Sequence, residues 1–483
     1  MRLVAPLDAV FFVPETAEQH MHVAGLEIFE LPAGAGGDWL VELYRRNIGP
    51  GEVAPMFRQR AERSLAALGA WVWQVDDHLD LEHHVRRWAL PRPGGASELA
   101  GMASFLHGTS LDRHRPLWEA HLIEGLERRR FALYARFHHA LMDGASAMRL
   151  LERSLSSDPD RRGMPPPWSP DGLARAADGD CSDSSEAEGS ELGRLVGAAA
   201  RVAVAGSEVF SVVPSMLRAA ESVLMGQVVG LPAPAPRTVF NVTITGWRRF
   251  GARSWSLERV RRVARAAAAT VNDVVLAMSA SALRRYLDEL GALPDDPLVA
   301  MTPVSLRSGR PAGASERPLA GNAVAAILCN LATNVADPSE RLATIMSSMA
   351  RGKESLAGLT PAQAVAVSAV AMAPMALAAL PLARHVSRPP FNLVISNLPG
   401  PAKDLFYDGA RLEAMYPLSI PTHNQGLNIT VVSYSGRLQF GLTGCSRTVP
   451  HIDRLLVHLE TGLSELEAVT GMDPVPGQPA GRR

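Results

Sequence analysis

An alternating run over residues 131–139 ends in two adjacent histidines and constrains this sequence more than any other feature. Alternation with period 2 predicts a β-strand whose two faces meet different surroundings. One face would carry Phe131, Leu133, Ala135, Phe137 and His139, and the other Ala132, Tyr134, Arg136 and His138. Because neighbouring side chains on a strand point to opposite faces, only one histidine can serve a pocket on the apolar side. That histidine is His139.

The pair Asp143-Gly144 follows, and it turns the chain into a helical pattern with Met148, Leu151 and Leu155 on one face. An imidazole with an ordinary pKa of about 6.5 can accept a proton near neutral pH, and a carboxylate at a short fixed offset can position it. Two structural alternatives stay open, namely that His139 is a buried core residue and that Asp143 is the N-cap of the helix. A metal site would need a third ligand at a matching interval, and none stands nearby in the sequence.

The length of 483 residues exceeds what one hydrophobic core usually supports, which predicts two domains. Hydrophobic residues make up 47% of the chain and charged residues 20%, as in globular proteins. The net charge of −1 gives no electrostatic reason to expect a nucleic-acid partner. Three cysteines, Cys181, Cys329 and Cys445, lie far apart without disulfide or redox spacing, which favours a reducing cytoplasm. The first residues make a poor signal peptide.

A shift in composition divides the chain. Residues 156–191 are rich in Pro, Gly, Ser and acidic side chains, and such a segment buries too little apolar surface to order itself. We therefore expect an N-terminal domain over residues 1–155, a flexible linker over 156–191 and a C-terminal domain over 192–483.

The histidine run also resembles a known signature. Residues His138 to Gly144 are similar to the HHxxxDG motif of the CoA-dependent acyltransferase superfamily, which includes chloramphenicol acetyltransferase, peptide-synthetase condensation domains and wax ester synthase/diacylglycerol acyltransferases. Pro116, Leu117 and Trp118 resemble the PLW motif of the last of these families. Residues 6–9, the Glu15-Thr16 pair and residues 21–23 resemble its opening segment. The blocks stand in family order and favour the wax ester synthase/diacylglycerol acyltransferase branch.

The second half of the chain carries further blocks of this resemblance. Asn272-Asp273 matches the family's ND motif, although Thr270 and Asp273 also stand like an N-cap and its partner at the start of a helix. Residues 303–307 resemble the PVSLR segment, and Ser396-Asn397 begins a block close to SNxPGP. In chloramphenicol acetyltransferase-like folds the aspartate of the histidine motif pairs with an arginine, so the resemblance makes Arg307 the candidate partner of Asp143.

The resemblance implies an α/β fold of two chloramphenicol acetyltransferase-like domains, each a mixed sheet flanked by helices, with an active-site tunnel between them. It implies transfer of a long-chain acyl group from acyl-CoA to diacylglycerol or to a long-chain alcohol, with His139 as the base, Asp143 as its companion, and His138 and Gly144 in support. No cofactor or metal is expected, since acyl-CoA is a co-substrate. A condensation-type acyltransferase and a non-catalytic lipid-binding or lipid-droplet protein remain as alternatives.

Lipidic substrates suggest a cytoplasmic protein that adheres to a membrane or lipid droplet without spanning it. Residues 362–380 form an apolar stretch near transmembrane length. The stretch is dominated by alanine and contains Gln363, Ser368 and Pro374. A buried or interface-lying helix is therefore the preferred interpretation.

Overall fold

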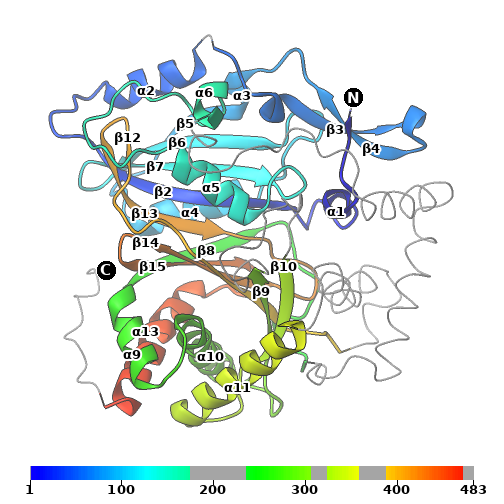
Figure 1. Cartoon of the computed structure of the whole chain (residues 1–483), viewed down its shortest axis with the longest axis vertical. Helices are drawn as coiled ribbons and strands as arrows, with labels where there is room; N and C mark the ends of the chain where they lie inside the picture. The colour runs from blue at the N-terminus through cyan, green and yellow to red at the C-terminus, as the bar shows by residue number, and fades with distance from the viewer. Residues whose placement is uncertain (1, 50, 175–234, 306–323, 358–387, 472–483) are drawn as a thin grey trace.

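The computed structural model describes residues 2–49, 51–174, 235–305, 324–357 and 388–471. Their strands form two six-stranded sheets and one three-stranded sheet. Figure 1 shows the two large sheets one above the other, with separate sets of helices. This mixed α/β architecture, with two lobes built on two sheets, is the fold class that the sequence predicted. The tunnel between the lobes stays a prediction.

The sheet of the first lobe carries the histidine run. Its strand order is β12-β13-β2-β7-β6-β5, and all neighbours are antiparallel except β5 and β6. The strands are β2 (His22–Glu30), β5 (Val85–Ala89), β6 (Trp118–Leu126), β7 (Arg130–His138), β12 (Phe406–Tyr407) and β13 (Ala410–Leu418). The last two come from the C-terminal half of the chain, so residues 406–418 complete the N-terminal sheet.

Strand β7 has the two faces that its sequence predicted. Phe131, Leu133, Ala135 and Phe137 pack beneath the helices α2 (Trp39–Ile48) and α5 (Gly144–Arg153). Ala132 and Tyr134 pack on the other face against α4 (Ala96–His107), which also contacts the second lobe. The backbone N–H of Phe250 donates to Ser104 Oγ of α4 at 2.9 Å. Helix α4 therefore joins the two lobes directly behind the histidine strand.

The sheet of the second lobe has the order β10-β9-β11-β14-β15-β8, with β11 parallel to both of its neighbours. The strands are β8 (Arg248–Ser256), β9 (Val299–Ser305), β10 (Val324–Asn330), β11 (Leu393–Leu398), β14 (Leu427–Tyr434) and β15 (Arg437–Cys445). A tight hairpin turn at Ser435-Gly436 joins β14 to β15, and both residues have the positive φ that such a turn requires.

Four helices cover one face of this second sheet, as Figure 1 shows: α9 (Leu257–Ala266), α10 (Val271–Glu289), α11 (Pro338–Ala357) and α13 (Ile452–Val469). Helix α10 lies centrally and is buried along most of its length. No single helix in the described ranges is long and apolar enough to cross a membrane, although α9 and α10 together pass that test across a 100° bend. The apolar stretch 362–380 lies outside the described residues.

A small sheet stands beside the first lobe. It consists of β1 (Arg2–Leu3), β4 (Ala70–Val75) and β3 (Gln59–Ser64), with the short helix η3 (Leu65–Ala67) in the turn between the last two. The chain continues from β1 into the helices α1 (Pro6–Ala9) and η1 (Val10–Phe12). Val4 and Phe12 of this segment share an apolar core with Ala61 and Trp73 of the small sheet.

Residues 156–174 differ from the exposed linker that their composition predicted. Ser156 exchanges backbone hydrogen bonds with Phe406 of β12, and Met164 and Trp168 are buried against the first lobe. The indole of Trp168 stacks on Trp118 at 5.4 Å between ring centroids. These few large apolar side chains supply enough buried surface to hold a segment that is otherwise rich in proline. The rest of the predicted linker, from residue 175, lies outside the described residues.

Candidate active site

The two histidines lie at the end of β7, where backbone hydrogen bonds from neighbours on both sides hold them. The N–H of His138 donates to the carbonyl of Leu117 at 2.9 Å, and that of His139 to the carbonyl of Met21 at 2.8 Å. Since these two bonds run to opposite neighbours, the alternation of the strand continues through His139, one residue beyond the last residue of β7.

His138 is fully buried and is fixed through its ring. Its Nδ1 accepts the backbone N–H of Ala140 at 3.1 Å, its Nε2 lies 3.4 Å from Glu15 Oε1, and its ring stacks on Phe12 at 4.7 Å. Burial alone would raise the pKa of Glu15, but the contact with His138 and the charge of Arg113 outweigh burial and lower it. A carboxylate therefore faces the His138 ring, which suits a residue that supports the turn.

His139 has a different environment. Its ring is partly exposed and stacks on Phe11 at 4.0 Å. Its Nδ1 is buried and has no hydrogen-bond partner within the part of the chain that the structure describes. Burial lowers the pKa of His139 to about 4, and the nearby charge of Asp143 only partly offsets this effect. The imidazole is therefore neutral at pH 7, which is the form that can accept a proton.

Asp143 is the N-cap of α5. Its Oδ1 accepts the backbone N–H of Ser146 at 2.6 Å, which satisfies one of the free amides of the first turn. Helix α5 begins at Gly144 as the sequence predicted. A second carboxyl, that of Asp8, lies near, and its pKa is raised by burial and by the charge of Asp143. Arg307, the expected partner of Asp143, lies outside the described residues, so that pair stays a prediction.

The capping bond leads to a prediction for Asp143. The variant Asp143→Ala should lower the free energy of unfolding by about 1 kcal/mol, the usual cost of losing an N-cap side chain. Asp143→Asn keeps an oxygen acceptor at the same place and should retain most of that stability. Thermal unfolding of both variants, followed by circular dichroism, measures the difference. Equal stability of wild type and Asp143→Ala would show that the cap contributes nothing.

The motif Pro116-Leu117-Trp118 supports the histidines through the core. The indole N–H of Trp118 donates to the carbonyl of Phe57 at 2.8 Å, and the ring of His84 stacks on it at 4.7 Å. Leu117 supplies the carbonyl that holds the N–H of His138. In the structure this motif is the entry to strand β6, with a packed aromatic residue as its first member.

The described candidates of the second half lie in α10 and β11 of the second lobe. Asp273 Oδ2 accepts from Thr270 N at 2.9 Å and from Thr270 Oγ1 at 2.7 Å, so the two residues form the predicted capping box at the start of α10. Asn272 follows Val271 in the first turn of that helix. Ser396 and Asn397 lie in β11 and pair with β14. A catalytic role for these residues stays a prediction.

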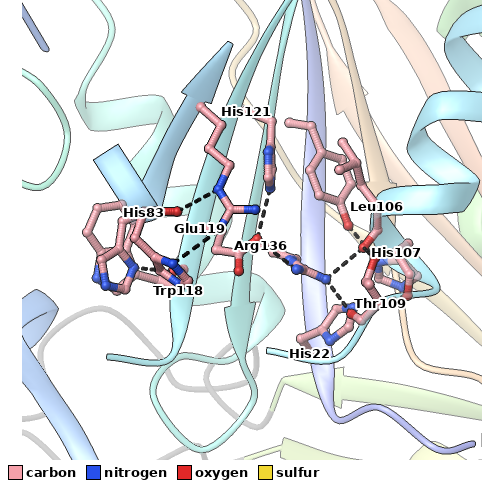
Figure 2. A network of polar contacts seen from close by, with 12 residues as sticks. His22, His83, Leu106, His107, Thr109, Trp118, Glu119, His121 and Arg136 are labelled. Atoms are coloured by element: carbon pink, nitrogen blue, oxygen red, sulfur yellow. Dashed lines mark hydrogen bonds and ion pairs between the residues drawn. The ribbon is translucent and has the colours of Figure 1, made fainter. Parts of the chain in front are cut away.

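Behind the histidine pair lies a buried polar network that the sequence interpretation missed (Figure 2). Arg136 of β7 donates to Glu119 Oε2 at 2.7 Å and to the carbonyl of Leu106 at 2.6 Å. Glu119 also contacts His121 Nε2 at 3.0 Å. The guanidinium makes a further hydrogen bond to the carbonyl of Thr109. Arg136 thus ties β7 to β6 and to the end of α4, two residues before His138.

Three further residues contact the two histidines and were not predicted from the sequence. Phe11 and Phe12 carry the rings on which the two histidines stack, and Glu15 was noted only as part of the family's opening segment. A pair of aromatic residues near the start of a chain is a weak signal, because nothing local connects it to a strand that begins at residue 130.

Two features lie outside the candidate site. An apolar pocket under α2 is lined by Phe29, Leu43, Phe131, Leu133 and Tyr407 among others. Leu133 stands six residues before His139, so this pocket lies about 20 Å along the strand from the histidine pair. In the ranges that the structure describes, no three His, Cys, Asp or Glu side chains form a group that could hold a metal ion.

Comparison with family models decides which acyltransferase-like group this geometry belongs to. The model of the wax ester synthase/diacylglycerol acyltransferase catalytic domain matches residues 4–275, and the model of the C-terminal domain of the same family matches residues 320–467. The chain belongs to the wax ester synthase/diacylglycerol acyltransferase family. The first match contains the histidine pair, Asp143 and the Pro-Leu-Trp motif.

Relatives of this wax ester synthase/diacylglycerol acyltransferase family member span its length. Over 473 residues it is 46% identical to the Mycobacterium tuberculosis H37Rv protein named probable diacylglycerol O-acyltransferase tgs2, covering 98% of this chain and 100% of the relative. The solved wax ester synthase/diacylglycerol acyltransferase from Marinobacter aquaeolei VT8 is 39% identical, with a TM-score of 0.77 over 98% of this chain and 100% of that one.

More distant structures share the fold alone. The first condensation domain of the calcium-dependent antibiotic synthetase superposes with a TM-score of 0.54 at 16% identity, covering 97% of this chain and 96% of that one. The two-lobed fold that the resemblance implied is therefore common to both groups.

Proposed function

We propose that this protein transfers a long-chain acyl group from acyl-CoA to the hydroxyl of diacylglycerol, giving triacylglycerol, and that it also accepts long-chain alcohols. The observation that carries this proposal is the neutral, partly exposed His139 beside Asp143 in a chain 46% identical to a named diacylglycerol O-acyltransferase. The Marinobacter relative, named for wax ester synthesis as well, supports the second class of acceptor.

In the proposed reaction His139 accepts the proton of the acceptor hydroxyl while that oxygen attacks the thioester carbonyl. The C–S bond then breaks, and the proton passes from the imidazolium to the departing CoA sulfur. A well-placed base accelerates such a step by roughly 10²–10⁴. Two bound substrates held in the right orientation contribute a further large share of the rate. Acyl-CoA is the co-substrate, and the scheme needs no metal or other cofactor.

Direct transfer is favoured over an acyl-enzyme, because a nucleophile must lie within hydrogen-bond reach of its base. Ser146 is the hydroxyl near His139 in the sequence, and its Oγ accepts a hydrogen bond from Arg149 at 2.8 Å within the first turns of α5. Cys329 and Cys445 are buried in the second lobe. Both thiols lie in strands of the second sheet, whereas His139 follows a strand of the first.

The lipid products of the reaction test the proposed function. Purified protein is given labelled palmitoyl-CoA with diacylglycerol or with hexadecanol, and the lipids are separated. We expect labelled triacylglycerol from the first acceptor and a labelled wax ester from the second. Labelled palmitate alone, or acyl-CoA left intact with both acceptors, would contradict an O-acyltransferase. A condensation-type activity would show as transfer to another hydroxyl acceptor only.

The pH profile follows from the environment of His139. Its pKa is lowered to about 4, chiefly by burial, so the ring stays neutral as pH falls from 7 to 5. The initial rate at low acyl-CoA should therefore stay level over this range and fall only as pH approaches 4. Circular dichroism at each pH tells folded protein from unfolded protein. A drop in rate centred near pH 6.5 with the fold intact would contradict a desolvated His139.

The proposal also covers location and partners. Long-chain acyl-CoA and diacylglycerol are lipids, so a protein that uses them works at a membrane surface or a lipid droplet on the cytoplasmic side. No nucleic-acid partner is proposed, since the net charge of −1 gives no electrostatic reason to expect one.

A further inference from the structure

The turn of the small sheet exposes two leucines. Leu65 and Leu68 stand in the turn around η3 between β3 and β4, and 95% and 70% of their surfaces are exposed. Figure 1 shows this β-ribbon reaching outward from the side of the first lobe. Transfer of two large aliphatic side chains from water into an apolar phase is favourable. Insertion of this projecting tip into such a phase would therefore release free energy.

The sequence of the tip carries no charge. Between Ser64 and Val75 there is no Asp, Glu, Lys or Arg, in a chain where charged residues make up 20%. Behind the tip lie Arg60, which pairs with Glu62 at 2.8 Å, and Arg63, whose guanidinium stands 5.1 Å from the ring centroid of Trp71. Apolar residues at the end of a ribbon, with tryptophan and arginine just behind them, are the order of side chains that fits a lipid surface and its headgroups.

Leu68 has a left-handed backbone conformation, with a φ of 55°. This conformation favours glycine or asparagine over a leucine, which tolerates it poorly. The leucine is therefore not there to suit the turn, and its exposed side chain does not pack in the core. Both observations point to a partner outside the chain.

Other exposed apolar side chains lie on the same unit. Leu3 of β1 and Val10 and Val13 at η1 are each more than half exposed. The intervening Phe11 and Phe12 point inward and stack on His139 and His138. Phe12 also stacks on Trp71 at 4.5 Å. The small sheet and η1 thus carry further exposed apolar side chains, next to the exposed Arg2 and Gln74, while the two rings of η1 contact the histidine pair.

We propose that the tip at Leu65 and Leu68 inserts into a phospholipid surface, and that this docks the candidate active site against the layer that holds diacylglycerol. The proposal rests on the proposed function for the identity of the acceptor. A lipid surface fits better than a protein groove, because the end of the ribbon projects from the lobe, is aliphatic and uncharged, and has Arg63 and Trp71 behind it at the depth of the headgroups.

The test uses the full-length protein and a double variant, Leu65→Ser with Leu68→Asn. Asparagine suits the left-handed position, so the turn should keep its conformation. The matched control changes two exposed valines of α13 in the other lobe, Val457→Ser with Val469→Asn, which are 48% and 44% exposed. Flotation with vesicles of phosphatidylcholine and phosphatidylglycerol, with and without diolein, measures binding.

We expect the tip variant to bind these vesicles at least about tenfold more weakly than wild type, since the full burial of even one leucine is worth about a factor of ten or more. Its transfer rate with vesicle-borne diolein should fall by a similar factor, and its rate with hexadecanol in detergent micelles should not change. The α13 control should bind as wild type does. Flotation of the tip variant equal to that of wild type would overturn the proposal.

Two further results separate the alternatives. If wild type floats and the tip variant does not, but neither makes any acyl product, the proposed function fails while the docking surface stands. If the tip pairs with a second copy of the chain, sedimentation would show a wild-type dimer that the tip variant loses, and that overturns lipid docking. A further variant, Leu65→Trp, should bind vesicles more tightly, with a blue shift of its fluorescence. Weaker binding, or no shift, would contradict insertion.

Discussion

Replacing His139 with alanine is expected to lower the rate of acyl transfer by about 10²–10⁴ while the protein stays folded, because the ring is the proposed base and bears little of the core packing. The residue is partly exposed, and among the described residues the ring contact of His139 is the stacking on Phe11. The loss should appear in the turnover number at saturating acyl-CoA. Circular dichroism and the thermal midpoint should stay close to those of wild type.

The companion variant His138→Ala tests the other member of the pair. His138 is fully buried, stacks on Phe12 and faces the carboxylate of Glu15. Its removal should lower the free energy of unfolding by roughly 1–3 kcal/mol, because Glu15 loses a partner while buried. At equal folded content, His138→Ala should retain more activity than His139→Ala. The reverse order would show that the two histidines have been assigned to the wrong roles.

Local pattern predicted the strand that carries the pair and the faces on which its side chains lie. Period 2 over residues 131–137 is a property of the strand itself, and both core faces of β7 follow it. The Asp-Gly turn likewise predicted the helix α5 that begins at Gly144, and it left open the capping role that Asp143 has in the structure. These features depend on neighbours a few residues apart, which is where sequence reasoning is strongest.

Features that depend on contacts between segments far apart in the sequence could not be predicted. Strands β12 and β13 complete the first sheet from residues 406–418, although the break in composition had suggested a simple division of the chain. Glu15 reaches His138 across more than a hundred residues, and the aromatic rings of η1 meet the histidines only in the folded protein. In each case the sequence pattern of one segment does not say which distant segment it contacts in the folded protein.

The link between Arg136 and Glu119 illustrates the same limit within the histidine strand. Both residues lie on adjacent strands in register, opposite each other in the pairing of β6 with β7. The alternation placed Arg136 on the second face but gave no reason for a buried cation there. The reason is the carboxylate of Glu119, together with the carbonyls of Leu106 and Thr109 at the end of α4 (Figure 2).

Glu119→Ala is expected to destabilise the protein strongly, by about 3–5 kcal/mol, because it leaves the buried Arg136 without its counter-charge. Glu119→Gln keeps an oxygen acceptor for Arg136 and should cost less. Thermal unfolding of the two variants at pH 7 gives the order. A Glu119→Ala protein as stable as wild type would mean that Leu106 and Thr109 satisfy the guanidinium on their own.

The pH dependence of the free energy of unfolding separates the contribution of the Glu119 charge from that of its packing. Burial raises the pKa of Glu119, but the hydrogen bond from His121 and the charge of Arg136 outweigh it and lower the pKa to about 2. In the unfolded chain a glutamate has a pKa of about 4.3, so the folded protein binds fewer protons at this site. Its stabilisation is thus complete above about pH 4.3 and is lost as pH falls toward 2.

The measurement compares the free energy of unfolding of wild type and of Glu119→Gln as a function of pH. The difference between the two proteins should show this loss. If the two curves fall in parallel from pH 5 to 2, Glu119 contributes no charge to the fold, and packing alone explains the effect of Glu119→Ala.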